Sequence, residues 1–171
     1  MARNIEIKAR LADIDATLAL ARPLADGEPQ LIAQDDTFFN AAKGRLKLRA
    51  FADGRGELIY YERPDQAGPK TSFYVLSPTA SPDTLREALT LAHGQIGRVR
   101  KLRTLLLAGR TRIHLDRVEG LGDFMELEVA LADDETLENG VAEAHALMAR
   151  LGIAADQLID VAYLDLLRAK G

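Results

Sequence analysis

The chain has 171 residues, of which 47% are hydrophobic and 28% charged, and its formal net charge is −4. This length fits one domain covering residues 1–171, and the apolar fraction together with the small net charge excludes a disordered chain. The absence of cysteine excludes disulfides, zinc–thiolate sites and cysteine nucleophiles, and the acidic balance argues against a general nucleic-acid binder.

The first predicted strand begins almost at the N-terminus. Over residues 4–10, charged and polar side chains alternate with apolar ones, which is typical of a strand with one buried face. The residues before it contain no apolar segment of the kind that a signal peptide needs, and no apolar run approaches the roughly 18 residues of a membrane span. We therefore expect a cytoplasmic protein that does not cross a membrane.

Further strands follow along the chain. Alternating or β-rich segments cover residues 45–49, 57–63, 71–76, 99–107, 111–118 and 124–131, which brings the number of candidate strands to about seven. A glycine-containing turn at residues 53–56 predicts that the second and third of them form a hairpin.

Four helices are predicted between and after the strands. A short helix is capped by Asp13 and ends near Pro23, and a second begins at Ser81-Pro82 and ends at Gly94. A third covers about residues 134–151 and a fourth about residues 156–169, each with an apolar stripe at helical spacing. These elements predict the α+β class, with antiparallel hairpins and helices packed outside.

The basic residues are concentrated in two windows. Residues 43–63 and 98–117 hold thirteen of the 22 lysines and arginines, and sixteen of the 22 are arginines. The planar guanidinium group matches phosphate oxygens in a bidentate way, so this distribution favours a polyanionic ligand.

Two glutamates form the clearest acidic motif. Glu126 and Glu128 lie two residues apart in one predicted strand and project from the same face, an arrangement that suits a hard divalent cation such as Mg²⁺. His114, in the preceding strand, is interpreted as a hydrogen-bonded structural histidine rather than a catalytic base. A half-solvated sheet would show similar alternation, with cross-strand ion pairs worth about 0.2–1 kcal/mol each, and it stays open as the alternative.

The apolar faces of the same strands favour an enclosed site. Ile5, Leu48 and Leu127 need cover, and the predicted helices can supply it from outside. If the sheet curls, its charged faces then meet across an interior, where charges of one sign are unstable without partners. A triphosphate with its Mg²⁺ would supply both signs.

Five segments together carry a resemblance to a known family: residues 4–8 (NIEIK), 44–49 (GRLKLR), 57–64 (ELIYYERP), 100–103 (RKLR) and 119–128 (EGLGDFMELE). In this order, and over nearly the whole chain, they resemble the CYTH or triphosphate tunnel metalloenzyme family, which includes class IV adenylate cyclases and thiamine triphosphatases. The resemblance implies a closed antiparallel eight-stranded β-barrel with helices outside. It also implies a triphosphate bound by basic residues and one or two Mg²⁺ or Mn²⁺ ions held by acidic ones.

The resemblance assigns these roles to particular residues. The implied metal ligands are Glu6, Glu126, Glu128 and Asp116, and the implied phosphate ligands are Lys8, Arg45, Lys47, Arg49, Lys101, Arg103 and Arg112. Two positions depart from the family pattern. Asn4 stands where the family has its first glutamate, and Arg63 stands where many members have a lysine.

Three functional hypotheses with a small-molecule ligand remain open, beside an RNA 5′-triphosphatase or other nucleic-acid role that only the arginines motivate. The first is an adenylate cyclase-like enzyme that converts ATP to cyclic AMP and pyrophosphate, and the second, ranked almost equally, is an inorganic or thiamine triphosphatase. The third is a non-catalytic nucleotide- or polyphosphate-binding protein, which Asn4 and the altered lysine position would explain. All three predict a triphosphate-bearing small molecule as the partner, and related cyclases suggest a homodimer.

Overall fold

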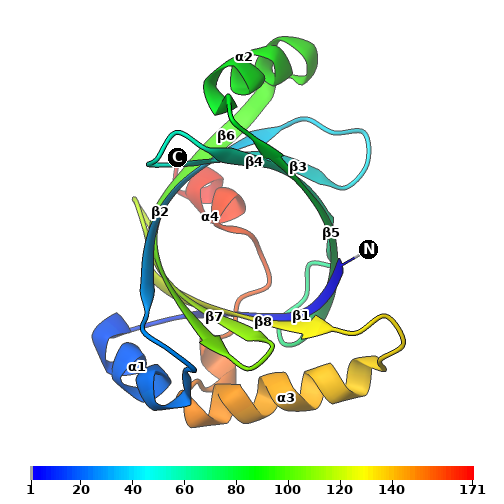
Figure 1. Ribbon diagram of the computed structural model, residues 1–171. Helices are drawn as coiled ribbons and strands as arrows, with labels where there is room; N and C mark the ends of the chain where they lie inside the picture. The colour runs from blue at the N-terminus through cyan, green and yellow to red at the C-terminus, as the bar shows by residue number, and fades with distance from the viewer. Residues whose placement is uncertain (1) are drawn as a thin grey trace.

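Eight antiparallel strands form a closed barrel in the computed structural model, which describes residues 2–171 (Figure 1). Around the barrel the strand order is β1-β5-β4-β3-β2-β6-β7-β8. The strands are β1 (Ala2–Arg10), β2 (Gln30–Phe39), β3 (Arg45–Phe51), β4 (Gly56–Glu62), β5 (Lys70–Thr79), β6 (Gln95–Ala108), β7 (Thr111–Val118) and β8 (Gly122–Leu131). The α+β class, the antiparallel tunnel and all seven strands predicted from the sequence are thereby confirmed.

The eighth strand, β2, has no simple alternation in sequence. Its inward side chains include the polar Gln34 and Asp36 beside the apolar Ile32 and Phe38. Its outward side is open to solvent at one end and covered at the other, because Leu31 is exposed and Phe39 is buried. Neither face is therefore uniformly polar or apolar, and a period-two pattern cannot reveal the strand.

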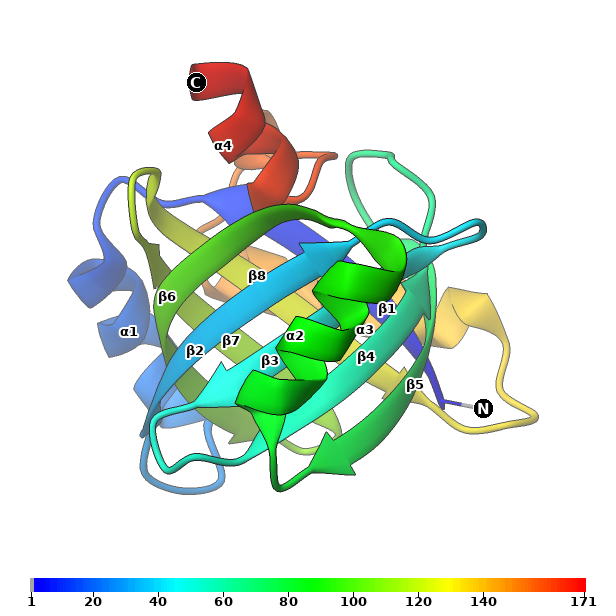
Figure 2. The same ribbon diagram turned by 90° about the horizontal axis from the view of Figure 1, so that it is seen from above.

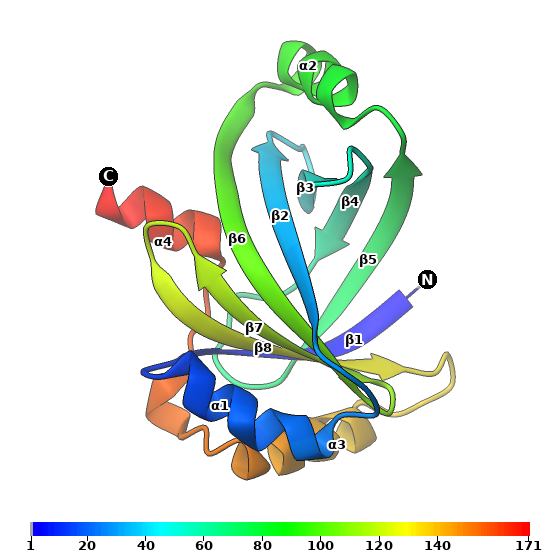
Figure 3. The ribbon, with the colours of Figure 1, turned by 60° about the vertical axis from the view of Figure 1, so that its left-hand side comes forward.

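The main hydrophobic core lies outside the barrel, beneath β1, β7 and β8. Helices α1 (Ile14–Ala21) and α3 (Leu137–Arg150) cover this side (Figure 3). Ile5, Ile113 and Leu127 point outward into the core and are fully buried. Gly140 lets α3 approach closely, since a Cβ there would lie 2.7 Å from Ile5 Cγ1. Because these outward faces are apolar, the polar side chains of the same strands point into the barrel.

Two more helices lie elsewhere on the barrel. Helix α2 (Pro82–His93) packs against β2 and β3, and α4 (Tyr163–Lys170) lies at one end of the strands (Figure 2). The predicted fourth helix began too early. Residues 155–157 form a 3₁₀ turn, and Ile159 N donates to Lys8 O, which holds the segment in extended form beside β1. No helix within residues 2–171 is long and apolar enough to span a membrane.

Candidate functional site

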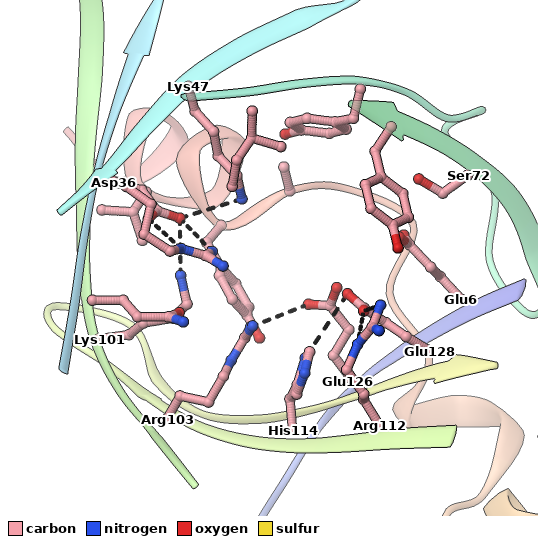
Figure 4. A pocket seen from close by; sticks show the side chains of 18 of the residues that line it. Glu6, Asp36, Lys47, Ser72, Lys101, Arg103, Arg112, His114, Glu126 and Glu128 are labelled. Carbon is pink, nitrogen blue, oxygen red and sulfur yellow. Dashed lines mark hydrogen bonds and ion pairs between the residues drawn. The ribbon is translucent and has the colours of Figure 1, made fainter. Parts of the chain in front are cut away.

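Inward-facing side chains line a cavity of about 380 Å³ inside the barrel. Nine of the eleven predicted site residues contribute to its wall: Glu6, Lys8, Lys47, Arg49, Lys101, Arg103, Arg112, Glu126 and Glu128. Figure 4 shows two clusters facing each other across the cavity, with Asp36 among Lys47 and Lys101 on one side, and Glu126 and Glu128 beside Arg112 on the other. The strands thus bring together most of the charged residues that the sequence and the family resemblance singled out.

One carboxylate organises the basic side of the cavity. Asp36, which is 1% exposed, accepts two hydrogen bonds of 2.8 Å from Arg49. Lys101 Nζ donates to Asp36 Oδ2 at 3.1 Å, and Lys47 Nζ lies 3.3 Å from the same oxygen. Three cationic side chains therefore share a single anionic partner.

The surplus of positive groups alters the protonation of the cluster. Burial alone would raise the pKa of Asp36, but the charges of Arg49, Lys101 and Lys47 outweigh it and hold the pKa well below its usual range. Burial, together with the charges of Arg49 and Arg103, lowers the pKa of Lys101 to about 7 against the opposite effect of Asp36. A polyanion entering this side would find cations that lack full compensation, and it would favour their charged forms.

The acidic side is built from β1 and β8. Glu6 faces Glu128 across the two strands, and Lys8 faces Glu126. Burial, followed by the charges of Glu126 and Glu128, raises the pKa of Glu6 to about 7, although Arg63 Nη1 lies 3.6 Å from its carboxylate. Carboxylates this crowded favour a cation between them.

His114 extends the acidic cluster from β7. One ligand atom from each of His114, Glu126 and Glu128 lies within 4.8 Å of the others. Burial, followed by the charge of Arg103, lowers the pKa of His114 to about 4, so the ring is neutral at pH 7. Its Nδ1 is buried and has no hydrogen-bond partner among residues 2–171, which differs from the hydrogen-bonded histidine expected from the sequence. Two carboxylates and a neutral imidazole are a donor set that fits a divalent cation.

Asp116 lies on the same strand face as Arg112 and His114, but it does not contribute to the cavity wall, unlike the other predicted metal ligands. It is 0% exposed, and both of its oxygens accept hydrogen bonds from Arg103, at 2.7 and 2.8 Å. The Tyr163 hydroxyl also donates to Asp116 Oδ2 at 2.9 Å. Asp116 therefore orients Arg103, whose side chain lines the cavity.

Arg45 is also placed differently from its predicted role. It does not contribute to the cavity wall, because its guanidinium bonds to Asp65 Oδ1 at 2.9 Å and lies 3.7 Å from Asp165. Arg45 is the first residue of β3, so its side chain lies at the end of the barrel, whereas Lys47 and Arg49 are further inside. Alternation along β3 puts Arg45, Lys47 and Arg49 on one strand face, but it does not encode how deep in the tunnel each side chain lies.

The two departures from the family pattern both lie in the cavity wall. Asn4 is buried beside Arg112 and accepts a 3.2 Å hydrogen bond from Arg112 Nη2 in the amide orientation that satisfies its neighbours. Arg63 points inward toward Glu6. A neutral amide and a guanidinium thus replace a carboxylate and a lysine.

Sequence reasoning missed Asp36 and the part played by Tyr163. Asp36 lies in β2, the strand that the sequence did not reveal. Its signal in the sequence is its spacing of two residues from Gln34 and from Phe38, which puts the three side chains on one face of a strand. Tyr163 comes from α4, where it lines the cavity while its ring lies 4.1 Å from Lys8 Nζ. Its position depends on how α4 docks on the barrel.

A family model described as the CYTH domain matches residues 2–163. The chain belongs to the CYTH domain family. This CYTH domain is 27% identical to a protein named adenylate cyclase CyaB from Aeromonas hydrophila, over 91% of this chain and 83% of the relative.

Solved structures share the fold of this CYTH domain. The PH1012 protein of Pyrococcus horikoshii matches with a TM-score of 0.83 and 22% identity, over 95% of this chain and 98% of the other. A Hippeastrum protein described as a putative adenylyl cyclase with a dominant triphosphatase activity matches with a TM-score of 0.66 and 17% identity, over 98% of this chain and 96% of the other. At these identities the likeness supports the tunnel architecture alone.

Proposed function

We propose that this CYTH domain is a metal-dependent enzyme that acts on the triphosphate group of a nucleotide, converting ATP to cyclic AMP and pyrophosphate. The observation that carries the proposal is the division of one enclosed cavity into a cation-rich side around Asp36 and a carboxylate-rich side around Glu126 and Glu128. A triphosphate complexed with a divalent cation has the matching division of charge.

The basic side would bind the phosphates. Arg49 and Arg103 present guanidinium groups that are already oriented by Asp36 and Asp116, and Lys101 adds an ammonium group. Binding to oriented side chains costs less conformational entropy than binding to mobile ones, and two-pronged guanidinium contacts fix the direction of each phosphate. These residues would therefore hold the triphosphate in one orientation along the cavity.

The acidic side would hold the cation. Glu126 and Glu128, with Glu6 beside them, are the residues that would bind Mg²⁺ or Mn²⁺. When bound, such an ion polarises phosphoryl oxygens and stabilises the negative charge that develops on them. Lys8, whose Nζ lies 3.8 Å from Glu126 Oε2, keeps that carboxylate ionised, because positive charges nearby lower the pKa of Glu126 against the opposite effect of burial.

The attacking oxygen distinguishes the cyclase from its closest alternative. In the cyclase reaction the ribose 3′-oxygen loses its proton and forms a bond to the α-phosphorus, and the bond from that phosphorus to the pyrophosphate oxygen breaks. In a triphosphatase, water attacks the terminal phosphorus and inorganic phosphate is released. The name of the Aeromonas relative favours the first reaction, and the triphosphatase activity described for the Hippeastrum protein favours the second.

The product profile tests the proposal. Purified protein is incubated with ATP, thiamine triphosphate or tripolyphosphate in the presence of Mg²⁺ or Mn²⁺, and cyclic AMP, pyrophosphate and phosphate are measured. Cyclic AMP and pyrophosphate in equal amounts from ATP would support the cyclase, whereas phosphate from tripolyphosphate or thiamine triphosphate would support the triphosphatase. Binding of all three compounds without turnover would refute catalysis and favour a binding protein, the outcome that Asn4 in place of a glutamate would explain.

A further inference from the structure

An imidazole nitrogen in the cavity wall has no partner within the described residues. His114 is 4% exposed, and its Nδ1 has no hydrogen-bond partner in residues 2–171. Buried polar atoms of this kind are rare in folded proteins, and an unpaired one calls for a partner from outside the chain. Because His114 points into the cavity, such a partner can reach it through the tunnel (Figure 4).

The unpaired nitrogen faces carboxylate oxygens. His114 Nδ1 lies 3.9 Å from Glu128 Oε1, and Glu126 completes a group whose ligand atoms all lie within 4.8 Å of one another. Donors bound to one cation at about 2.1 Å are separated by about 3 Å when adjacent and about 4.2 Å when opposite. The observed spacing is close to that range.

A neighbouring arginine leaves the relevant oxygen free. Arg112 donates from Nε and Nη2 to Glu128 Oε2, at 2.9 and 2.6 Å. The other oxygen, Oε1, is the one turned toward His114. On Glu126, the cations Lys8 and Arg103 both approach Oε2, each at 3.8 Å. The cations thus all approach the Oε2 atoms of the two carboxylates. His114, from the neighbouring strand β7, faces Oε1 of Glu128.

We propose that His114 Nδ1 is a nitrogen ligand of the divalent cation held by Glu126 and Glu128, and that it makes the site select transition-metal ions such as Mn²⁺ over Mg²⁺. Mg²⁺ takes oxygen ligands almost exclusively, whereas divalent transition metals gain from an imidazole donor. The inference rests on the proposed function for the site, and it goes beyond that function in naming the third ligand and the resulting metal preference.

Electron paramagnetic resonance of bound Mn²⁺ tests the ligand assignment without any turnover. The full chain is loaded with Mn²⁺, and electron spin-echo modulation is recorded for protein with natural-abundance and with ¹⁵N-labelled histidine. A nitrogen coupling that changes with the ¹⁵N label is expected. His114→Gln should abolish this coupling, and His145→Gln should leave it unchanged because His145 lies exposed on α3.

Metal titrations of the same proteins test the selectivity. His114→Gln should weaken Mn²⁺ binding by at least about tenfold, the lower limit seen when even an outer partner of a metal site is lost. Mg²⁺ binding should weaken by a smaller factor, so that the preference for Mn²⁺ falls. If the variant folds poorly, the ¹⁵N-labelled wild-type protein still shows whether a histidine nitrogen binds Mn²⁺.

The possible failures are distinguishable. Bound Mn²⁺ without histidine nitrogen coupling, or equal losses for both ions, would overturn the role of His114. Failure of the free protein to bind Mn²⁺ would overturn it as well. In each of these cases, turnover of a triphosphate in the product assay would still support the proposed function. The reverse result, histidine nitrogen coupling without turnover of any triphosphate, would support the metal ligand and refute the proposed enzyme activity.

Discussion

Replacement of Asp36 by asparagine should expose the electrostatic imbalance of the basic side. Asp36→Asn keeps the shape of the side chain and removes the negative charge that Arg49, Lys47 and Lys101 share. Removal of one partner from a buried ion pair costs about 3–5 kcal/mol, because the remaining charge is left uncompensated. The variant should therefore unfold at a temperature about 6–20 °C lower, at about 2–4 °C per kcal/mol for a chain of this size.

Thermal unfolding with and without tripolyphosphate measures this effect. The same ligand concentration should raise the unfolding temperature of Asp36→Asn more than that of the wild type, because the polyanion replaces the missing charge. Asp65→Asn is a matched control, since Asp65 pairs with Arg45 but is 53% exposed, and its loss should cost less than about 1 kcal/mol.

Two results would refute this reasoning. One is an Asp36→Asn variant that unfolds at the same temperature as Asp65→Asn. The other is an equal stabilisation of the wild type and the variant by tripolyphosphate. Either result would mean that Asp36 does not balance the cations that are expected to bind phosphate.

The remaining predictions concern the acidic side, the tunnel end and pH. Glu126→Ala and Glu128→Ala should each lower turnover by more than about a hundredfold while circular dichroism shows a retained fold, and near-normal turnover in both would refute their metal role. Arg45→Ala should change the KM for a triphosphate little, because the side chain lies outside the cavity, and a large rise in KM would contradict that placement. In metal-free protein the pKa of Glu6 is raised from 4.5 to about 7, so the folded state takes up this proton first and is stabilised as pH falls. The pKa of His114 is lowered from 6.5 to about 4, so its protonation favours the unfolded state over the same pH range. Glu6→Gln removes the stabilising protonation, so its unfolding free energy should fall by about 2 kcal/mol relative to wild type between pH 6.5 and pH 4.5. Parallel profiles from denaturant unfolding would refute this.

The sequence could predict the strands whose two faces differ in polarity. In β1 and β8, apolar side chains such as Ile7 and Leu127 alternate with Lys8 and Glu126, because one face meets helices and the other meets the cavity. The family resemblance then implied that these faces close into a tunnel, which the topology confirms. The start of α4 was not predictable, because the apolar spacing that precedes it belongs to an extended segment bridged to β1 through Leu158.

The depth of a side chain in the tunnel and its partners were decided only in three dimensions. Glu6 meets Glu128, and Lys8 meets Glu126, across strands that are far apart in the chain. Asp36 gathers cations from two neighbouring strands, and Asp116 bonds to Arg103. By itself the sequence determined which residues are charged and which strand face they share, since alternation is a local property of an extended backbone. Closure of the barrel decided which of those charges meet, because strand register and curvature depend on the packing of the whole sheet.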